Sequence, residues 1–478
     1  MPFVDSSSQL EPLLFQMKQY KNLTKSTIEI LPSSGQTAYY PGSKLTFTLP
    51  YASLIALEDL ALHFEYQGVA PKIGNTDLIR VMAPKDVASL IAEVDIRING
   101  QTIQHLTSYG DIVNLLNVFE QAKTAKTALQ GFDVNNMKKR VEPDNGTFAD
   151  AVNGLLAAKT NQNNKHKYVI NHWYGLLGAR GKEVSSNFLD TNMLGEVTIS
   201  FVFAKANVCF FGTAPDSDAR IQNSTVPANA VDEASANTAI TANTTVGSFI
   251  INAPKMSMVR YNLPQNYSEA LRSNLSSGAK YQIAFNHYEI HSQLAGQNEG
   301  TLRWNENSRD IKGLIAFFTN GNRDSKSIAS KYDDLVRTSD YFKYDNPIHD
   351  KSHFQIGSVM MPQNALDSTD CFLELTRAIA GARGNNTEFF IGIQTVEDFL
   401  STYFMNYLSL EMTEGMTTEA NGGKKLLSGL SSEQLPISCV YKYKNLQSSF
   451  AWNKNVNVMS LTTRLLVIEN GQNCYVEI

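Results

Sequence analysis

Residues 93–106 read EVDIRINGQTIQHL, two short runs of mixed polarity joined by the pair Asn99-Gly100. The first run alternates polar residues with the apolar residues Val94, Ile96 and Ile98. Successive side chains of a strand point to opposite faces, so this alternation predicts a half-buried strand. Asn99 and Gly100 both tolerate positive φ angles, which a type I′ turn requires. The stretch therefore predicts a β-hairpin with its turn at Asn99-Gly100.

A two-residue turn also fixes which residues of the two strands face each other. We expect three cross-strand pairs, Ile98 with Gln101, Ile96 with Ile103 and Val94 with His105. The apolar face then continues onto the second strand. Since no reactive side chain lies beside the turn, we interpret the hairpin as fixing strand register, with no part in catalysis.

A helical pattern follows the hairpin directly, in TSYGDIVNLLNVFEQ, residues 107–121. The apolar residues that recur at helical spacing are Ile112, Leu115, Leu116 and Phe119. Ser108 and Asp111 match the pattern of a capping box, in which the first side chain accepts from a first-turn amide. We expect one helix here, capped by Ser108 and packed on the edge or end of a sheet.

Composition limits the classes of protein to consider. The chain has 478 residues, which favours two or three domains, and we expect two. It contains 24 Phe and 20 Tyr, and its 18% of charged residues lies below the usual ~25%. Such a chain can bury large sheets and subunit interfaces, which excludes a disordered or coiled-coil protein. The net charge of −5 gives no basic field, so we expect no specific nucleic-acid binding.

The four cysteines, Cys209, Cys371, Cys439 and Cys474, lie far apart and form no metal-binding spacing. Three of them lie in apolar runs, where a free thiol behaves as a small hydrophobe, so we expect buried reduced thiols. The first 22 residues lack the basic segment and apolar core of a secretory signal. No stretch reaches the ~18 uninterrupted apolar residues of a membrane span. We therefore expect folding in a reducing compartment.

Two polar segments divide the strand patterns. Residues 122–167 show no strand alternation, and their basic cluster at 138–140 fits a solvated loop better than a nucleic-acid site, because no aromatic residues interleave with it. Residues 213–246 are small, polar and slightly acidic. The expected organisation is an N-terminal arm at 1–25, a first β domain at 26–212 with the insertion at 122–167, a connection at 213–246 and a second β domain at 247–478.

The second half repeats the order of strands, helical insertion and strands. Residues 366–383 and 395–412 show helical spacing of apolar residues, the second through Phe399, Tyr403 and Tyr407. The polar stretch HDKSH, residues 349–353, is interpreted as a loop. Asn470-Gly471 near the C-terminus predicts one more hairpin.

Catalytic and metal-binding motifs are not found. The sequence has no GxxxxGK[ST], GxSxG, HExxH or GxGxxG pattern, so we expect no enzymatic activity and no cofactor. His287, Glu289 and His291 in HYEIH would share one face of a strand, but no further ligand with fixed spacing accompanies them. We interpret them as a solvated or interfacial face and expect neither a metal site nor a catalytic residue.

The order of segments resembles the double jelly-roll major capsid proteins of icosahedral DNA viruses, the lineage of adenovirus hexon and tectivirus capsids. The likeness is greatest to the capsid proteins of polinton-like viruses and virophages. Four stretches of the sequence carry this likeness. They are residues 27–66 (beginning TIEILPSS), 90–119 (beginning LIAEVDIRING), 173–211 (beginning WYGLLGARG) and 249–290 (beginning FIINAPKMSM). The match of order covers most of the chain, while the segments 122–167 and 213–246 depart from it.

The resemblance implies an all-β fold of two tandem eight-stranded antiparallel jelly rolls, with a few short helices and long loop insertions. It further implies a homotrimeric, pseudo-hexagonal capsomer that tiles an icosahedral virion shell, with penton and minor capsid proteins as further partners. Synthesis and assembly would take place in the reducing cytoplasm or nucleus of a host cell. Direct membrane contact stays open. The alternatives are a minor capsid or penton protein, which would form pentamers, and a β-sandwich carbohydrate-binding or hydrolytic protein.

Overall fold

The computed structural model describes most of both β domains. The described residues are 24–51, 53–69, 79–84, 86–118, 165–178, 188–213, 248–262, 269, 273, 277–278, 280–296, 298–320, 344–383, 396, 399–400, 403–410, 429–432, 436–446, 454–469 and 473–477. The expected arm up to residue 23, most of the insertion at 122–167 and the connection at 214–246 lie outside them.

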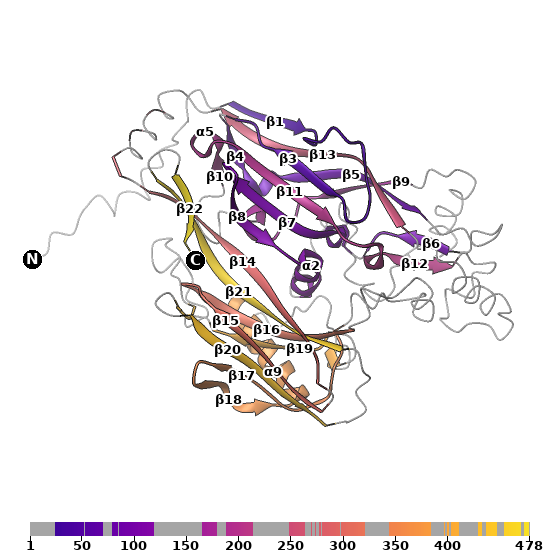
Figure 1. The fold of residues 1–478 in the computed structure, drawn as a ribbon, viewed down its shortest axis with the longest axis vertical. Coiled ribbons are helices and arrows are strands. Elements are labelled where there is room, and N and C mark those ends of the chain that lie inside the picture. The colour runs from indigo at the N-terminus through magenta and orange to yellow at the C-terminus, as the bar shows by residue number, and fades with distance from the viewer. Residues whose placement is uncertain are drawn as a thin grey trace, which may run out of the picture.

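The first β-sandwich packs a seven-stranded sheet against a four-stranded one (Figure 1). The seven-stranded sheet contains β10 (Phe188–Asp190), β4 (Leu54–Ala56), β13 (Ser248–Asn262), β5 (Ala61–Val69) and β9 (Lys165–Ile170) in that order, with β1 (Thr24–Ile30) and β2 (Ala38–Tyr39) paired to β13. The four-stranded sheet has the order β3 (Lys44–Thr48), β11 (Val197–Phe203), β7 (Ile91–Ile98) and β8 (Gln101–Leu106). A separate ribbon joins β6 (Ile79–Met82) to β12 (Phe210–Thr213).

The second β-sandwich packs a five-stranded sheet against another four-stranded one. The five-stranded sheet has the order β14 (Tyr281–Leu294), β21 (Lys454–Glu469), β16 (Ile311–Asn320) and β19 (Met405–Ser409), with β22 (Asn473–Glu477) paired to β21. Its partner has the order β15 (Glu299–Glu306), β20 (Ile437–Asn445), β17 (His349–Ile356) and β18 (Val359–Leu366). The expected architecture of two antiparallel β-sandwiches is therefore confirmed.

Helices are few and short among the described residues. They are α2 (Tyr109–Asn117), α5 (Thr191–Leu194) and α9 (Ser368–Arg383), with the 3-10 turns η1 (Leu57–Asp59), η2 (Val87–Leu90), η3 (Gly175–Gly178) and η4 (Ala206–Val208). α2 and α9 correspond to two of the helical segments that the sequence predicted, residues 107–121 and 366–383. None of the described helices combines the length and apolar character that crossing a membrane requires.

Aromatic side chains fill the core between the sheets, as the composition indicated. In the first sandwich, Phe201 of β11 stacks on Trp173 with ring centroids 5.3 Å apart and meets Phe47 of β3 edge-on. The Trp173 indole N–H donates to the carbonyl of Leu60 at 2.8 Å, which satisfies the polar atom of a buried ring. One continuous cluster of buried apolar residues extends through both sandwiches. The two units are therefore packed on each other as well as internally.

The pairing of β13 corrects the expected domain boundary. The sequence placed residues 247–478 in the second domain, yet β13 pairs with β1, β2, β4 and β5 of the first. In Figure 1 the salmon-coloured β13 lies among the indigo strands of the upper sandwich. The second sandwich therefore begins after Asn262. Strand pairing extends the first sandwich at its start as well, since β1 begins at Thr24, inside the expected arm.

Two further sequence predictions are wrong. The stretch HDKSH is part of strand β17, not a loop. The segment 395–412 is not one helix, because its second half forms β19, which pairs with β16. Tyr403 lies before that strand and forms a single bridge to Tyr344.

Candidate functional site: the joint between the two sandwiches

The hairpin turn at Asn99-Gly100 has the geometry that the sequence indicated. Asn99 has φ 51° and Gly100 has φ 79°, both in the left-handed region that a type I′ turn uses. Ile98 pairs with Gln101 across the two-residue loop. The turn thus closes the hairpin of β7 and β8 in the expected register at its tip.

The side chain of Asn99 does more than permit the turn. Its Nδ2 donates to the carbonyl of Leu194 at 2.8 Å, and its Oδ1 accepts from the amide of Glu196 at 3.1 Å. Between them lies Gly195, with φ 76°, where an added Cβ would stand 2.3 Å from the Asn99 Oδ1. Asn99 therefore clamps the connection from α5 to β11 against the hairpin tip, and the clamp leaves room only for glycine at position 195.

Beyond the turn, the expected register is wrong by one residue. A bulge between Ile96 and Arg97 places Ile96 opposite Gln104, not Ile103, and Val94 opposite Leu106, not His105. A β-bulge places one extra residue in one strand of a pair. The side chains beyond it then point to the opposite face from the one that regular pairing would give. As a result Gln104 points inward and is only 1% exposed.

Gln104 joins the two sandwiches. Its Oε1 accepts from the amide of Leu176 in η3 at 2.7 Å, and its Nε2 donates to the carbonyl of Asn286 in β14 at 3.1 Å. Gly175 has φ 81°, and a Cβ there would lie 2.5 Å from the Gln104 Oε1, so the approach of η3 requires glycine. One buried side chain thus binds both its own sandwich and the neighbouring one.

The joint covers an open sheet edge. Among the described strands, β14 is the terminal strand of its sheet, and β8 and η3 pack against it from the first sandwich. Figure 1 shows β14 between the upper sandwich and the lower sheets. Uncovered edge strands pair with other chains, so covering this edge prevents unwanted pairing and fixes the sandwiches to each other.

Polar and aromatic contacts reinforce the joint on both sides of Gln104. Lys312 of β16 donates through Nζ to the Oδ1 of Asn286 at 2.9 Å. The Tyr281 hydroxyl donates to the carbonyl of Phe188 at 2.9 Å, which ties the start of β14 to β10. Tyr174 and Tyr288 meet edge-on across the joint with ring centroids 6.1 Å apart. The joint is therefore a hydrogen-bonded interface along much of β14.

The capping prediction at Ser108 and Asp111 is wrong in its mechanism, although the helix begins where expected. Ser108 has φ 54°, and its hydroxyl makes no capping hydrogen bond. The left-handed backbone at Ser108 directs its side chain away from the first-turn amides. Instead, the Ser108 carbonyl accepts from the amides of Asp111 and Ile112, at 2.9 and 3.2 Å. Asp111 lies buried in the first turn, where a carboxylate is favoured by the helix dipole.

A buried polar chain connects α2 to the joint. Asp86 is fully buried, and its carboxylate accepts from the Ala88 amide at 2.9 Å and from the Asn117 Nδ2 at 3.0 Å. Asn117 in turn accepts from the Tyr174 hydroxyl at 3.2 Å, and the Tyr174 amide donates to the Tyr109 hydroxyl at 3.1 Å. Each polar group has a partner, so this network orients Tyr174 for its contact with β14.

The histidines of HYEIH do not converge. His287 is buried in the joint, with its Nδ1 3.4 Å from the Gln104 Nε2. His291 stacks on Trp304, and its Nε2 lies 3.7 Å from the Glu306 Oε1. Glu289 is exposed. The described residues contain no group of three or more His, Cys, Asp or Glu side chains arranged to hold a metal ion.

A second buried histidine, His349, lies in the core of the second sandwich. Its Nδ1 lies 3.2 Å from the Asn445 Oδ1, and its Nε2 lies 3.1 Å from the Tyr441 hydroxyl. Because the amide oxygen only accepts, Nδ1 carries the proton and Nε2 accepts from Tyr441. Burial lowers the pKa of His349 from 6.5 to about 3, and the hydrogen bond to Asn445 opposes this only in part. His349 is therefore a neutral core residue.

Three of the four cysteines are buried, as expected. Cys209, Cys371 and Cys439 are buried, and Cys474 is half-buried. Burial raises the pKa of Cys371 and Cys439 to about 12. The thiolate is the nucleophile, so we expect these two thiols to stay protonated and to react slowly near neutral pH.

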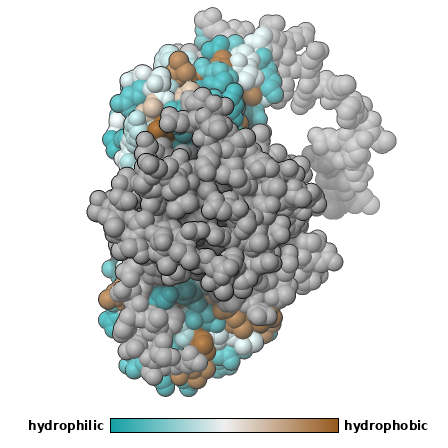
Figure 2. Space-filling view, turned by 90° about the vertical axis from the view of Figure 1, so that its right-hand side faces the viewer, coloured by the Kyte–Doolittle hydropathy of each residue, from teal (hydrophilic) through white to brown (hydrophobic). Residues whose placement is uncertain are grey.

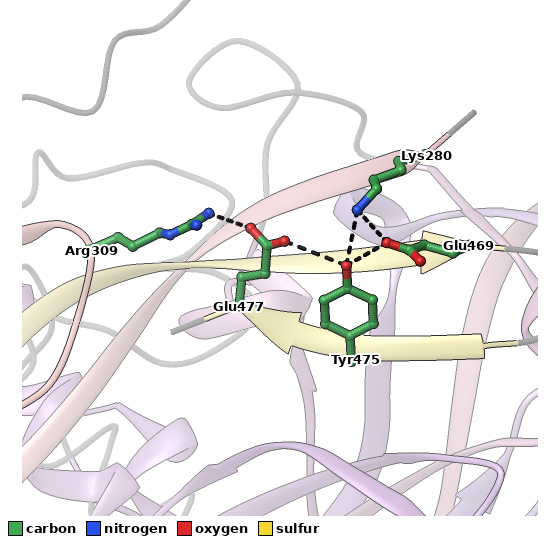
Figure 3. A network of polar contacts seen from close by, with 5 residues as sticks. All are labelled: Lys280, Arg309, Glu469, Tyr475 and Glu477. Carbon is green, nitrogen blue, oxygen red and sulfur yellow. Dashed lines mark hydrogen bonds and ion pairs between the residues drawn. The ribbon is translucent and has the colours of Figure 1, made fainter. Parts of the chain in front are cut away.

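Charged residues hold the C-terminal strand (Figure 3). Tyr475 of β22 donates to the Glu469 carboxylate at 2.5 Å and accepts from the Lys280 Nζ at 3.3 Å. Lys280 also pairs with Glu469, and Arg309 pairs with Glu477. The hydrogen bond from Lys280, the largest cause, holds the pKa of the Glu469 carboxyl below its usual range. These contacts fix β22 against β21 and β14.

Apolar side chains reach the surface of the second sandwich. Figure 2 shows brown apolar side chains among teal polar ones at the lower end of the molecule. The large apolar side chains of this sandwich that are at least one third exposed are Leu294, Ile348, Val359, Met360, Leu373, Val396 and Leu446.

Comparison with known proteins gives the fold a precedent. No family model matches the chain, and no curated protein sequence matches it. Among solved structures, the chain is similar to PBCV-1 VP54 fitted into a reconstruction of the virophage Sputnik, with a TM-score of 0.54, 11% identity and coverage of 96% of this chain and 98% of that one.

Two further structures agree over nearly the whole chain. The Sputnik virophage structure has a TM-score of 0.52 and 11% identity, with 97% of this chain and 91% of that one covered. The Faustovirus major capsid protein has a TM-score of 0.54 and 8% identity, with 95% and 92% covered. Both sandwiches and the joint between them fall within these matches. The chain therefore has the fold of the double jelly-roll major capsid proteins.

Proposed function

We propose that the protein is a major capsid protein that acts by assembly and catalyses no reaction. The observation that carries this proposal is the structural likeness to viral capsid proteins, which covers 96% of this chain and 98% of the first match. The likeness includes both sandwiches in one chain, so a shared single domain does not account for it. The location that follows is the virion.

The joint supports this role physically. A shell subunit must present the same outline in every copy, so its two jelly rolls need a fixed mutual orientation. Gln104, the Tyr174–Tyr288 contact and the covered edge of β14 supply that rigidity.

The capsomer that we infer is a homotrimer. Three copies of a two-roll chain place six similar rolls around one axis, which gives a pseudo-hexagonal outline that tiles a curved shell. The exposed apolar side chains of the second jelly roll are suited to contacts between copies. Penton and minor capsid proteins would complete the shell at positions where the trimer does not fit. Assembly would follow synthesis in the reducing cytoplasm or nucleus of the host cell, since the thiols are free.

Native mass spectrometry tests the assembly state directly. The proposal predicts a species of three times 53.0 kDa that persists on dilution. Circular dichroism on the same sample shows whether the chain is folded and β-rich. A folded protein that stays monomeric at all concentrations contradicts the proposal, and a pentamer supports a penton protein instead. Binding of sugars by a folded monomer would favour the carbohydrate-binding alternative.

A further inference from the structure

His287 occupies a place in the joint where only a neutral imidazole fits. Its side chain is 5% exposed, and its Nδ1 lies 3.4 Å from the Nε2 of Gln104. The Gln104 Oε1 already accepts from Leu176, so the amide N–H₂ group necessarily faces His287 and the Asn286 carbonyl. An N–H₂ group only donates, so Nδ1 of His287 faces it as an acceptor without a proton. Protonation at Nδ1 would set two donors against each other.

The charged groups around His287 are mostly cationic. From β21 comes Arg464, and from β8 comes His105, which itself lies 3.5 Å from Glu93. Lys312 of β16 binds the side chain of Asn286, which points to the other face of β14 from His287. η3 has the sequence Gly-Leu-Leu-Gly and contributes no titratable side chain.

The nearest carboxylate on the strand of His287 itself is Glu289, which is exposed and acts on Arg464. Burial, followed by the charges of Arg464 and His105, lowers the pKa of His287 from 6.5 to about 3. The closed joint therefore excludes the proton that a solvated histidine would take up in mild acid.

We propose that the joint between the two jelly rolls is an acid-sensitive hinge, in which protonation of His287 releases β14 from Gln104 and η3. The trigger lies at an interface between two units that each have their own sheets. Opening an interface exposes less apolar surface than unfolding a roll, so it requires less free energy. The inference concerns this chain alone and stands whether or not the chain forms a capsid.

The size of the effect follows from proton linkage. In the open joint His287 is solvated and has its ordinary pKa of 6.5, whereas in the closed joint the value is about 3. Between pH 7 and pH 5 the equilibrium constant for opening then rises about 25-fold. Removing the titratable group should remove this rise.

Hydrogen exchange on the full chain measures the opening. Peptides that cover β8, η3 and residues 283–290 of β14 report on the joint, and peptides of β11, in the roll that does not contain His349, report on the interior of a roll. After correction for the intrinsic pH dependence of exchange, we expect joint peptides to exchange about 25-fold faster at pH 5 than at pH 7. Peptides of β11 should change far less. An equal rise in all peptides would mean global unfolding and would overturn the proposal.

Two variants identify the group responsible. His287→Gln retains an amide that can accept from Gln104 and should make exchange at the joint independent of pH over this range. His353→Gln, which alters a half-buried histidine of β17 away from the joint, should retain the wild-type rise. If His287→Gln keeps the 25-fold rise, or His353→Gln abolishes it, the assignment to His287 is wrong.

Gln104→Glu provides a test that does not depend on the folding of the His287 variant. The new carboxylate keeps an acceptor for the Leu176 amide, but it loses the donor to Asn286 and can pair with protonated His287. The pH dependence should therefore reverse, with slower exchange at the joint at pH 5 than at pH 7. Exchange of this variant that accelerates in acid as the wild type does would contradict the proposal.

Discussion

At the scale of single residues, Asn99 combines a turn conformation with a clamp. Glycine tolerates the positive φ of this position, so Asn99→Gly keeps the turn and removes only the side-chain hydrogen bonds to Leu194 and Glu196. We expect the free energy of unfolding to fall by about 1–2 kcal/mol. Chemical denaturation measures this change. A variant as stable as the wild type would show that the clamp contributes nothing.

His349 makes stability depend on pH. Its folded-state pKa of about 3 lies below the ordinary 6.5, so the unfolded chain takes up the proton first. The stability that the neutral residue contributes is complete above pH 6.5 and is lost as pH falls toward 3. The loss amounts to about 1.4 kcal/mol per pH unit.

His349→Gln isolates this effect, because glutamine can still donate to Asn445 and accept from Tyr441. Denaturation curves between pH 6.5 and 4 should show a dependence on pH that is shallower by about 1.4 kcal/mol per unit than in the wild type. Identical slopes in the two proteins would mean that His349 is not the neutral core residue described above.

Residue identity alone predicted the turn but not the joint. Asn99-Gly100 is a local signal, because both residues tolerate the backbone angles that the turn needs. Gln104 and His287 are polar residues next to apolar positions in their strands. This pattern gives only a weak indication that their side chains point inward. Their roles depend on a bulge in β8 and on contacts between segments more than 180 residues apart. Neither can be inferred from local preference.

At the scale of elements, strands with regular alternation were predictable and strands with buried polar residues were not. β7 follows the alternation of apolar residues, and its position in the hairpin is confirmed. β17 places His349 and Ser352 inward, where hydrogen bonds satisfy them, so its pattern resembled a polar loop. The apparent helix at 395–412 gave way to β19 because pairing with β16 outweighs helical spacing.

The thiols give an element-scale test of packing. Cys371 begins the buried face of α9, and Cys439 lies inside β20; both have pKa values of about 12, and that of Cys474 in β22 is about 11. We expect none of them to react at an appreciable rate with Ellman's reagent at pH 8 in the folded protein. All four cysteines should react in guanidinium chloride. Rapid reaction of more than one thiol in the native protein would contradict the described packing.

β22 should detach locally when its polar contacts are removed. Tyr475→Phe deletes the hydroxyl that joins Lys280, Glu469 and Glu477 (Figure 3). We expect faster hydrogen exchange in residues 473–477 with little change in overall stability, because these contacts lie at the partly exposed end of the sheet, where polar pairs contribute little. High salt should produce the same local effect in the wild type. If the exchange rate of β22 is unchanged in both experiments, the backbone pairing with β21 alone holds β22 in place, and the prediction is wrong.

At the scale of the whole molecule, the sequence indicated two β-sandwiches but misplaced their boundary. Residues 213–246 separate the two halves in composition, so β13 was assigned to the second half. In the structure the chain returns after this connection, and β13 pairs with β1, β2, β4 and β5 of the first sandwich. Which sheet a strand joins is decided by long-range pairing that local composition does not record.

The two jelly rolls therefore act as one rigid subunit, with a covered edge at β14 and a polar core at the joint. In the capsomer that we propose, two similar lobes in each chain would let three copies fill a nearly sixfold position. The proposed acid-sensitive joint adds that this rigidity depends on a neutral His287. The packing of the two rolls on each other and the proposed acid sensitivity of the joint both arise from the contact between the rolls. Neither is a property of one roll alone.

Electron microscopy of the purified oligomer tests the central claim most directly. If the chain is a major capsid protein, class averages should show a threefold particle with six lobes in a pseudo-hexagonal outline, two lobes for each chain. Particles with two lobes at every concentration, or fivefold rings, would contradict a trimeric capsomer.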